Sequence, residues 1–406
     1  MSENITEVTP ATQLELSRFV AENALEKKDP FVIAGGRTAL HLRKNSSKSL
    51  LTLSTAELTE IIDYPARDMT ITVEAGLRVE QLQQLLAEER QQLPVDISQA
   101  NHATIGGAIA TNCSGSRRFK YGTFRDYVIG VSAVDATGSR FSAGGRVVKN
   151  VAGYDLCKLL TGSWGTLAVT TQLTLKLKPI PERFQFLWIS YSCWDDVEKG
   201  LQQILKTKTA PVVVDAINRQ SALTIAAEAR IDMITKQPLL VLGIEGTAKE
   251  VDWQIKQLQH EFSSTNHSEL VILPPEESGR LLNAMTDFSI YADAPLTFYA
   301  SLSPSKIIEF LQMCEEDKIA VMSHAGNGIV RGVFPDSIII PTQAERILSS
   351  LRNFVLQSGG TFTILECEND WKDKLLLPIT PEPKNWSQQL KHRLDPYKLL
   401  NPAHLF

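Results

Sequence analysis

The sequence predicts an α+β fold made of two domains, on three observations. At 406 residues, the chain exceeds the length over which one hydrophobic core keeps growing. Nearly half of its 23 glycines fall within residues 103–179. Beyond the segment PIPE, Pro179–Glu182, the glycine density falls and strand-like and helix-like patterns alternate. We therefore predict a glycine-rich domain over 1–180 and an α+β cap or substrate domain over 181–394.

The first domain opens on a predicted amphipathic helix within residues 11–28, whose apolar face consists of Leu16, Phe19, Val20 and Ala24. The apolar strand Phe31–Ala34 follows and runs into the turn GGRT at 35–38. A second strand, Thr70–Glu74, turns at Gly76 into a helix with a leucine-rich buried side.

Two further strand patterns complete this domain. Residues Tyr127–Asp135 and Arg140–Ser142 are strand-like and are joined by Ala-Thr-Gly-Ser, which indicates a hairpin. Strict apolar–polar alternation from Leu167 to Leu177 predicts a long, half-buried strand that stops at Pro179.

The second domain is expected to alternate strands with helices. The predicted strands are Phe186–Tyr191, Val212–Ile217 and Leu239–Glu245, and the predicted helices lie around Val197–Leu205 and Val251–Phe262. The chain ends LDPYKLLNPAHLF, where two prolines and Asn401 favour an ordered, non-helical tail over 395–406.

Composition argues against several classes of partner. The formal net charge is −5 and basic residues occur only in short pairs, which argues against nucleic acid or an anionic membrane. No apolar run approaches the roughly 18 residues that span a bilayer, and the polar start MSENITEVTP is not typical of a secretory signal. The 5 cysteines are scattered without a CxxC pattern, so neither a disulfide framework nor an iron–sulfur motif is indicated. We expect a cytoplasmic protein.

The glycine clusters are interleaved with hydroxyl and amide side chains. Such a mixture suits a cradle of backbone N–H groups and hydroxyls around a phosphate-bearing ligand, although a single GG pair is equally typical of a tight turn. No G-x-G-x-x-G or GxxxxGK[ST] motif is present, which excludes both common nucleotide-binding motifs. The interleaved residues are Thr104, Thr111, Asn112, Ser114, Ser116 and Thr123.

Four motifs carry a resemblance to a known family. ATIGGAIATNCSGSRR (103–118), continued by YGTFRDYVIGV (121–131), resembles the FAD-binding domain of the vanillyl-alcohol oxidase/p-cresol methylhydroxylase (PCMH) class. AGGRT (34–38) resembles its first pyrophosphate-binding turn. GGRVVKNVAGYDLCKLLTGSWGTLAV (144–169) and DPYKLLNP (395–402) resemble the FAD-binding, E-type subunit of bacterial glycolate oxidases. The resemblance implies a two-subdomain PCMH-type FAD-binding domain with a C-terminal tail that returns to the flavin.

The resemblance also implies where FAD binds. Backbone N–H groups of the 35–38 turn, with those of Gly106 and Gly107, would neutralise the pyrophosphate. Gly165 and Val169 would contact the adenine side, and Asn401 would lie near the isoalloxazine ring. The full predicted set is Gly35, Gly36, Arg37, Thr38, Thr104, Gly106, Gly107, Asn112, Ser114, Gly115, Gly122, Thr123, Arg125, Gly165, Val169 and Asn401.

We predict that the FAD is held non-covalently. Covalent attachment in part of this class uses a histidine beside the first glycine turn, and the nearest histidine here is His41, five residues beyond Gly36. Cys113 lies inside the second motif, where we expect it to be a small buried residue.

For the chemistry, the family implies hydride transfer from a 2-hydroxy acid such as glycolate to FAD, giving glyoxylate, while a base removes the hydroxyl proton. SHAGNG (323–328), followed by Arg331, resembles the H-x-G-D-G-N-x-H motif of related 2-hydroxyacid dehydrogenases, whose two histidines can bind a metal. Arg331 stands where the second histidine would be, so we predict no metal. His324 is the predicted base or substrate ligand and Arg331 the predicted clamp for the substrate carboxylate. The alternatives are a structural histidine and an arginine paired with a surface acid.

Three functions stay open at this point. The first is a catalytic subunit of a glycolate oxidase complex, with a larger flavin subunit and an iron–sulfur subunit as partners. The second is a flavin subunit that only relays electrons or supports the complex, which the missing second histidine favours for turnover itself. The third is a stand-alone FAD-dependent hydroxy-acid or alcohol oxidoreductase.

Overall fold

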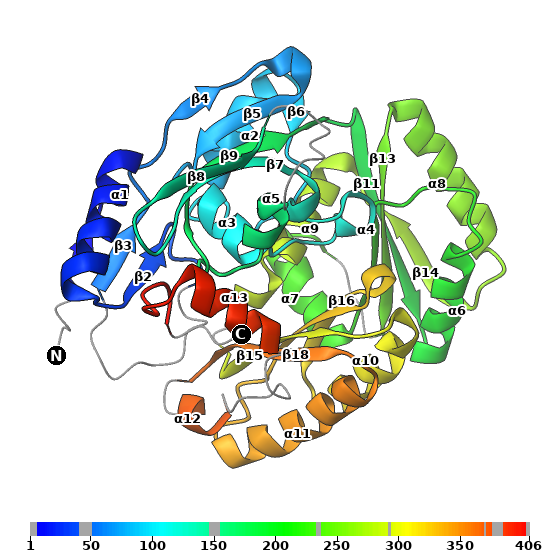
Figure 1. Cartoon of the computed structure of the whole chain (residues 1–406). Helices are drawn as coiled ribbons and strands as arrows, with labels where there is room; N and C mark the ends of the chain where they lie inside the picture. Colours follow the sequence, from blue (N-terminus) through cyan, green and yellow to red (C-terminus); the bar gives the residue numbers. More distant parts are fainter. Residues whose placement is uncertain are drawn as a thin grey trace. The chain divides into compact units, whose positions relative to one another are not determined.

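The computed structural model describes residues 6–39, 51–145, 155–232, 237–290, 294–368, 371–375 and 385–402, and it divides into two compact units (Figure 1). Unit 1 contains the described residues of Met1–Ser114, Gly122–Ile180 and Pro378–Phe406. Unit 2 contains those of Gly115–Tyr121 and Pro181–Leu377. His41 and the KNVAGYD motif up to Tyr154 lie outside the described residues.

The break after Ile180 falls within the PIPE segment, but two segments are assigned differently from the domains expected from the sequence. Gly115–Tyr121 belongs to unit 2, because Ser116 and Tyr121 make hydrogen bonds to strands of that unit. Helix α13, Asn385–Leu394, belongs to unit 1, because Lys391 bonds to the backbone there.

The described residues of unit 1 form three sheets. A parallel sheet has the order β1-β3-β2, an antiparallel sheet has the order β4-β5-β9-β7-β8, and β6 pairs with β10. Its strands are β1 Glu7–Val8, β2 Phe31–Ala34, β3 Leu51–Ser54, β4 Ile61–Asp63, β5 Thr70–Glu74, β6 Gln91–Gln92, β7 Val128–Val134, β8 Arg140–Gly144, β9 Val169–Lys176 and β10 Lys178–Pro179. Its helices are α1 Gln13–Glu22, α2 Val79–Glu88, α3 Ile105–Thr111, α5 Leu156–Leu160 and α13.

The expected elements of this unit form close to where the patterns placed them. The first helix is capped by the Thr12 side chain, which accepts from the N–H of Glu15, and a π-helical turn, Asn23–Lys27, carries it to Lys28. Strands β2 and β5 have the predicted bounds, and the predicted hairpin is β7 paired with β8. The long alternating strand begins at Val169, two residues later than Leu167. One apolar cluster joins α1, β2 and β9 to Leu399 and Leu400 of the C-terminal tail.

Unit 2 is organised around one eight-stranded antiparallel sheet of order β14-β11-β13-β12-β16-β17-β15-β18. Its strands are β11 Arg183–Tyr191, β12 Val213–Ile217, β13 Leu239–Gly246, β14 His267–Ile272, β15 Leu296–Ser301, β16 Ala320–His324, β17 Ile329–Val333 and β18 Thr361–Cys367. Its helices are α4 Arg118–Tyr121, α6 Trp194–Ile204, α7 Arg219–Ala229, α8 Ala248–Phe262, α9 Pro275–Thr286, α10 Ile307–Glu316, α11 Pro341–Gln357 and α12 Lys372–Leu375.

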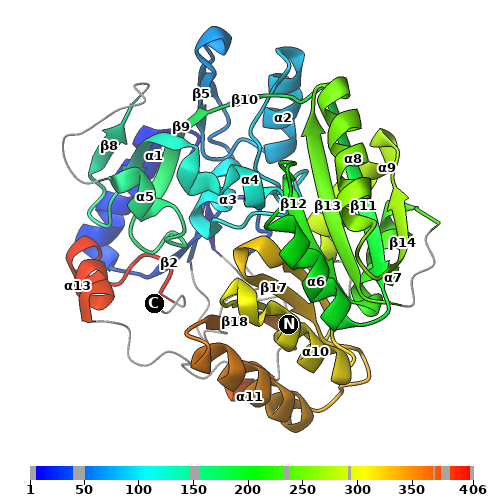
Figure 2. The same ribbon diagram turned by 90° about the vertical axis from the view of Figure 1, so that its right-hand side faces the viewer.

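Both faces of this sheet are covered, which explains why its central strands are apolar throughout. Leu240 and Leu242 of β13 point into a core shared with α6, α8, α10 and α11. Leu239 and Val241 of the same strand point into a second core shared with α7 and α9. Figure 2 shows α6 and α8 beside β11 and β13. The α+β prediction is confirmed, and among the described residues no helix has the length and apolar character to cross a membrane.

Candidate functional site

The two predicted glycine turns of unit 1 meet. A Cβ on Gly36 would lie 1.8 Å from the carbonyl oxygen of His102, and a Cβ on Gly35 would lie 2.1 Å from Oγ1 of Thr104. Only glycine fits either position, because a neighbouring backbone or capping side chain fills the space. The close approach places the 35–38 turn directly beside the start of α3, which the Thr104 side chain caps by accepting from the N–H of Gly107.

The backbone donors of the two turns differ in availability. Within the described part of the chain, no group accepts a hydrogen bond from the N–H groups of Gly35 to Thr38. The N–H of Gly106, however, donates to the carbonyl of Ala75 at 2.8 Å, and that of Gly107 donates to Thr104 Oγ1. The expectation that Gly106 and Gly107 add phosphate donors is therefore wrong for their N–H groups.

These two glycines instead serve packing and access. A Cβ on Gly106 would lie 2.7 Å from the Cβ of Ala75, so this position packs tightly against strand β5 and its following turn. Apart from the helix's own backbone, a Cβ on Gly107 would meet Thr104 Oγ1 alone among the described residues, at 3.2 Å. The Cα of Gly107 therefore faces space that the described side chains leave open, where a ligand can approach the backbone.

The end of α3 carries the next predicted contacts. Asn112 caps the helix in the left-handed region with φ of 52°, and its buried Oδ1 has no hydrogen-bond partner among the described residues. Ser114 is buried as well. Cys113 between them is exposed, so the expectation of a buried cysteine is wrong: the chain has left the helix there and turns this side chain outward.

The YGTFRD segment forms a tight, capped turn. Gly122 has φ of +78°, and a Cβ there would lie 2.3 Å from Oδ2 of Asp126. That carboxylate accepts from the N–H of Thr123 at 2.9 Å. Asp126 thus fixes this turn, while the Arg125 side chain is exposed and its charge contributes to lowering the pKa of Asp155, after the larger effect of the hydrogen bond from the Lys158 N–H.

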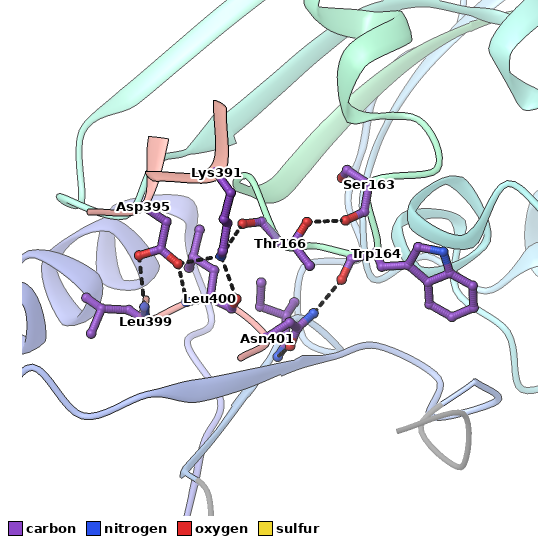
Figure 3. Close-up of polar contacts among 9 residues, drawn as sticks. Ser163, Trp164, Thr166, Lys391, Asp395, Leu399, Leu400 and Asn401 are labelled. Atoms are coloured by element: carbon purple, nitrogen blue, oxygen red, sulfur yellow. Dashed lines mark hydrogen bonds and ion pairs between the residues drawn. The ribbon is translucent and has the colours of Figure 1, made fainter. Parts of the chain in front are cut away.

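Asn401 lies beside the Trp164–Gly165 turn, and Figure 3 shows its hydrogen bond to Trp164. Asn401 Oδ1 accepts from the N–H of Ile33 at 2.8 Å, and its Nδ2 donates to the carbonyl of Trp164 at 2.6 Å. A Cβ on Gly165 would lie 2.8 Å from that Nδ2. The resemblance predicts that Gly165 contacts the adenine and that Asn401 lies near the isoalloxazine ring. These two rings are the opposite ends of an extended FAD, so two adjacent residues cannot make both contacts with it. The side chain of Val169 is fully buried in the apolar core, so a contact of this residue with the adenine would be made through its backbone.

In unit 2, His324 belongs to a buried polar group that includes two residues absent from the predicted set. Its Nδ1 lies 3.1 Å from both carboxylate oxygens of Asp215, and the Ser116 hydroxyl donates to Asp215 Oδ2 at 2.5 Å. His324 is 1% exposed and Asp215 is 0% exposed. The Nε2 of His324 has no partner among the described residues. Asp215 therefore orients one side of the imidazole, and the buried Nε2 on the other side keeps its capacity to take a proton or a hydrogen bond.

Arg331 lies on the strand next to His324 but has another kind of partner. It is 8% exposed, and its Nη1 donates to the carbonyl of Thr286, the last residue of α9. A buried guanidinium at a helix C-terminus stabilises the carbonyls there. The described contact of this guanidinium is with the backbone at the end of α9, which favours a structural role; its role as a substrate clamp stays a prediction. Among the described residues, no cluster of three or more histidine, cysteine or acidic side chains could hold a metal.

Comparison with known proteins identifies the class. A family model described as FAD binding domain matches residues 6–144. D-lactate dehydrogenase of Archaeoglobus fulgidus is 33% identical over 416 residues, which cover 99% of this chain and 91% of that protein. Glycolate oxidase subunit GlcE of Escherichia coli is 29% identical over 385 residues, 94% of each chain. Glycolate oxidase subunit GlcD of Bacillus subtilis is 27% identical over 417 residues, 98% of this chain and 88% of that protein.

The fold agrees with that class. Alkyldihydroxyacetonephosphate synthase superposes with a TM-score of 0.71 at 17% identity, covering 98% of this chain and 76% of that one, which shows a shared fold alone. The chain belongs to the FAD-dependent oxidoreductases with a PCMH-type FAD-binding domain, the family that includes these D-lactate dehydrogenases and glycolate oxidase subunits. Its cofactor is FAD, as the resemblance predicted.

The described residues of unit 1 fit this cofactor. The N–H groups of the 35–38 turn are donors suited to a pyrophosphate, and the Gly107 backbone leaves room for close approach. The unpartnered Oδ1 of Asn112 is an acceptor suited to a ribityl hydroxyl.

Proposed function

We propose that this chain oxidises a small 2-hydroxy acid, with glycolate the first candidate, as the E-type flavin subunit of a glycolate oxidase complex. The observation that carries the proposal is the Asp215–His324 pair with its unpartnered Nε2. Oxidation of a hydroxy acid needs a group that accepts the hydroxyl proton, and this imidazole is the described side chain best prepared to do so.

In this proposal, Asp215 selects the tautomer of the His324 imidazole. A neutral imidazole whose Nδ1–H points at the Asp215 carboxylate leaves Nε2 as a proton acceptor. When Nε2 takes the hydroxyl proton, the imidazolium that forms is stabilised by the same carboxylate. The Ser116 hydroxyl holds that carboxylate in place. FAD, when bound, supplies the hydride acceptor.

We propose that unit 1 binds the FAD non-covalently. The 35–38 turn would hold the pyrophosphate through backbone N–H groups, and Asn112 would bind the ribityl chain. Acid precipitation of the purified protein tests this: the yellow flavin should leave the pellet and be identified as FAD, whereas flavin retained in the pellet would show a covalent bond.

The partner subunits are part of the same proposal. The relatives named as glycolate oxidase subunits support assembly with a larger flavin subunit, and the lack of a cysteine cluster in this sequence calls for an iron–sulfur subunit or a diffusible acceptor to remove electrons. The D-lactate dehydrogenase relative makes D-lactate the second candidate substrate.

The test is anaerobic mixing of the purified chain with glycolate, D-lactate and L-lactate, followed by the visible absorbance of its flavin. Fastest bleaching by glycolate supports the proposal, and fastest bleaching by D-lactate replaces glycolate as substrate. If no acid bleaches the flavin of the chain alone, and glycolate bleaches it at the wild-type rate in a complex that carries His324→Gln, the chain is an electron relay and the catalytic role of His324 is refuted.

A further inference from the structure

Lys391 makes three hydrogen bonds that join separate parts of unit 1 (Figure 3). Its Nζ donates to the carbonyl of Thr166 at 2.6 Å, to Asp395 Oδ2 at 2.5 Å and to the carbonyl of Leu400 at 2.9 Å. An ammonium has three donors, so all of them are used. Burial lowers the pKa of Lys391, while the bond to Asp395 opposes that shift.

Asp395 accepts hydrogen bonds from the backbone of residues that follow it in the tail. This fully buried carboxylate accepts from the N–H of Leu399 at 2.8 Å and from the N–H of Leu400 at 2.9 Å, in addition to Lys391. The two leucines are then held in the apolar core of unit 1. The helix α13 and the tail thus form one unit locked by a buried charge pair.

The tail is also attached to the edge of β2. The N–H of Phe31 donates to the carbonyl of Leu399 at 2.8 Å, and the N–H of Asn401 donates back to the carbonyl of Phe31 at 3.0 Å. Asn401 Oδ1 takes the N–H of Ile33. The tail therefore extends the parallel sheet at the strand that leads into the 35–38 turn.

The same tail fixes the turn before β9. Trp164 and Gly165 both have positive φ, 54° and 65°. Residues with a side chain, such as Trp164, rarely adopt this backbone conformation. Its carbonyl accepts from Asn401 and that of Thr166 accepts from Lys391. From the other side, the N–H of Trp164 donates to the carbonyl of Ala110 in α3. This strained turn is held between the tail and the helix that carries Gly107.

We propose that Lys391, Asp395 and Asn401 form a C-terminal latch that positions the turns at 35–38 and 162–166 for FAD binding. The latch bridges two segments that are more than a hundred residues apart, and both adjoin residues predicted to contact FAD. The inference rests on the proposed placement of FAD on the turns of unit 1. Lys391 and Asn401 are positioning residues, because they act through these turns.

The test measures FAD affinity of Lys391→Met and Asn401→Leu by titrating apoprotein with FAD and following the quenching of flavin fluorescence. Lys391→Met removes all three bonds and Asn401→Leu removes both side-chain bonds at the far end of the latch. We expect FAD to bind about 10-fold more weakly or worse in each, with altered visible circular dichroism of the flavin that remains bound. Having two variants keeps the test decisive if one does not fold.

The matched control is Val20→Ala, which opens a cavity in the same apolar core without touching either turn. It should lower the melting temperature of the apoprotein as much as the latch variants do, with wild-type FAD affinity and flavin circular dichroism. If the latch variants behave like Val20→Ala, the latch only stabilises the fold and the proposal is overturned. Gly107→Val, titrated in parallel, separates the two ideas: normal FAD binding in that variant would refute the placement of FAD on these turns.

Discussion

The two units prepare their functional groups in different ways. In unit 1, the groups suited to FAD are mostly backbone N–H groups of a glycine turn that have no acceptor among the described residues. In unit 2, the candidate group is a side chain, His324, oriented by Asp215 from a neighbouring strand. A binding site made of backbone groups is blocked when a glycine gains a side chain. A site made of side chains loses its chemistry when one of those side chains is replaced. Mutations in the two units should therefore separate cofactor binding from turnover.

The largest expected effect is loss of FAD in Gly107→Val. Among the described residues outside the helix's own backbone, a Cβ at this position would meet Thr104 Oγ1 alone, at 3.2 Å, so the fold should tolerate valine after a small shift of that side chain, while the branched side chain fills the space for a ligand. We expect FAD affinity to fall about 100-fold or more, a loss of at least roughly 2.7 kcal/mol, with little change in the melting temperature of the apoprotein. Fluorescence titration with FAD measures the first and circular dichroism the second.

Gly279→Val is its matched control in unit 2, because a Cβ at Gly279 would have no described atom within 4 Å beyond the backbone of its own helix. It should bind FAD normally. Equal flavin content in both variants would show that the turn beginning α3 has only a structural role.

Asp215→Asn should have the next largest effect, this time on turnover. The amide keeps the shape but no longer stabilises a charged imidazole, and general base catalysis contributes about 10²–10⁴-fold to such reactions. We expect flavin reduction by the preferred acid to slow about 100-fold or more, with unchanged FAD affinity, in anaerobic stopped-flow measurements. Ser116→Ala removes only the hydroxyl that supports the carboxylate, so a loss below about 10-fold is expected. A wild-type rate in Asp215→Asn would remove the pair from the mechanism.

Arg331→Met should affect stability rather than substrate binding. Its guanidinium bonds to the carbonyl that ends α9, and leaving a buried carbonyl unsatisfied costs about 1–3 kcal/mol. Urea unfolding should show this loss, while calorimetric titration with oxalate should give wild-type affinity. Weaker oxalate binding by the folded variant would restore Arg331 as the carboxylate clamp.

The smallest effects concern the cysteines. Cys113 in unit 1 and Cys193 in unit 2 are exposed, whereas Cys157, Cys314 and Cys367 are buried. Burial raises the pKa of Cys157 to about 11, so its reactive thiolate forms only as the pH rises toward that value. Near pH 8, a thiol reagent should label the two exposed cysteines of the native protein.

FAD should make these two cysteines differ. Cys113 lies between Asn112 and Ser114, both predicted to contact the cofactor, so bound FAD should slow its labelling several-fold and leave Cys193 unaffected. Mass spectrometry of the labelled peptides measures both rates. Equal labelling rates with and without FAD would place the cofactor away from the end of α3.

The difference between the units also explains what could be predicted. The roles of the glycines at 35, 36 and 106 could be predicted from the sequence, because neighbouring atoms lie so close to these positions that no other residue fits. The sequence points to only one member of the Asp215–His324 pair. VVVDAIN does show an acid inside an apolar strand, which signals a buried partner, but the sequence does not reveal which of the seven histidines it is. The partner lies 109 residues away because β12 and β16 are neighbours in the sheet, and strand order is not encoded locally.

The interpretation of two predicted site residues depends on burial, which their motifs do not show. Val169 and Arg331 match family motifs by position, but burial decides their roles: one completes an apolar core and the other ends a helix. The contacts of the C-terminal tail could not be predicted from its sequence either. LDPYKLLNP predicts an ordered, non-helical segment, and its described residues up to 402 are so, yet the contacts of this region with Thr166 and Ile33 depend on how distant segments pack.

The most direct test of the whole account is His324→Gln, assayed for FAD content and for anaerobic flavin bleaching by the acid that the wild type oxidises fastest. Glutamine removes the proton acceptor in unit 2 and leaves the glycine turns of unit 1 untouched. The account predicts full, non-covalent FAD and bleaching at least about 100-fold slower than in the wild type. Bleaching at the wild-type rate, or loss of the FAD itself, would contradict the division of cofactor binding and proton transfer between the two units.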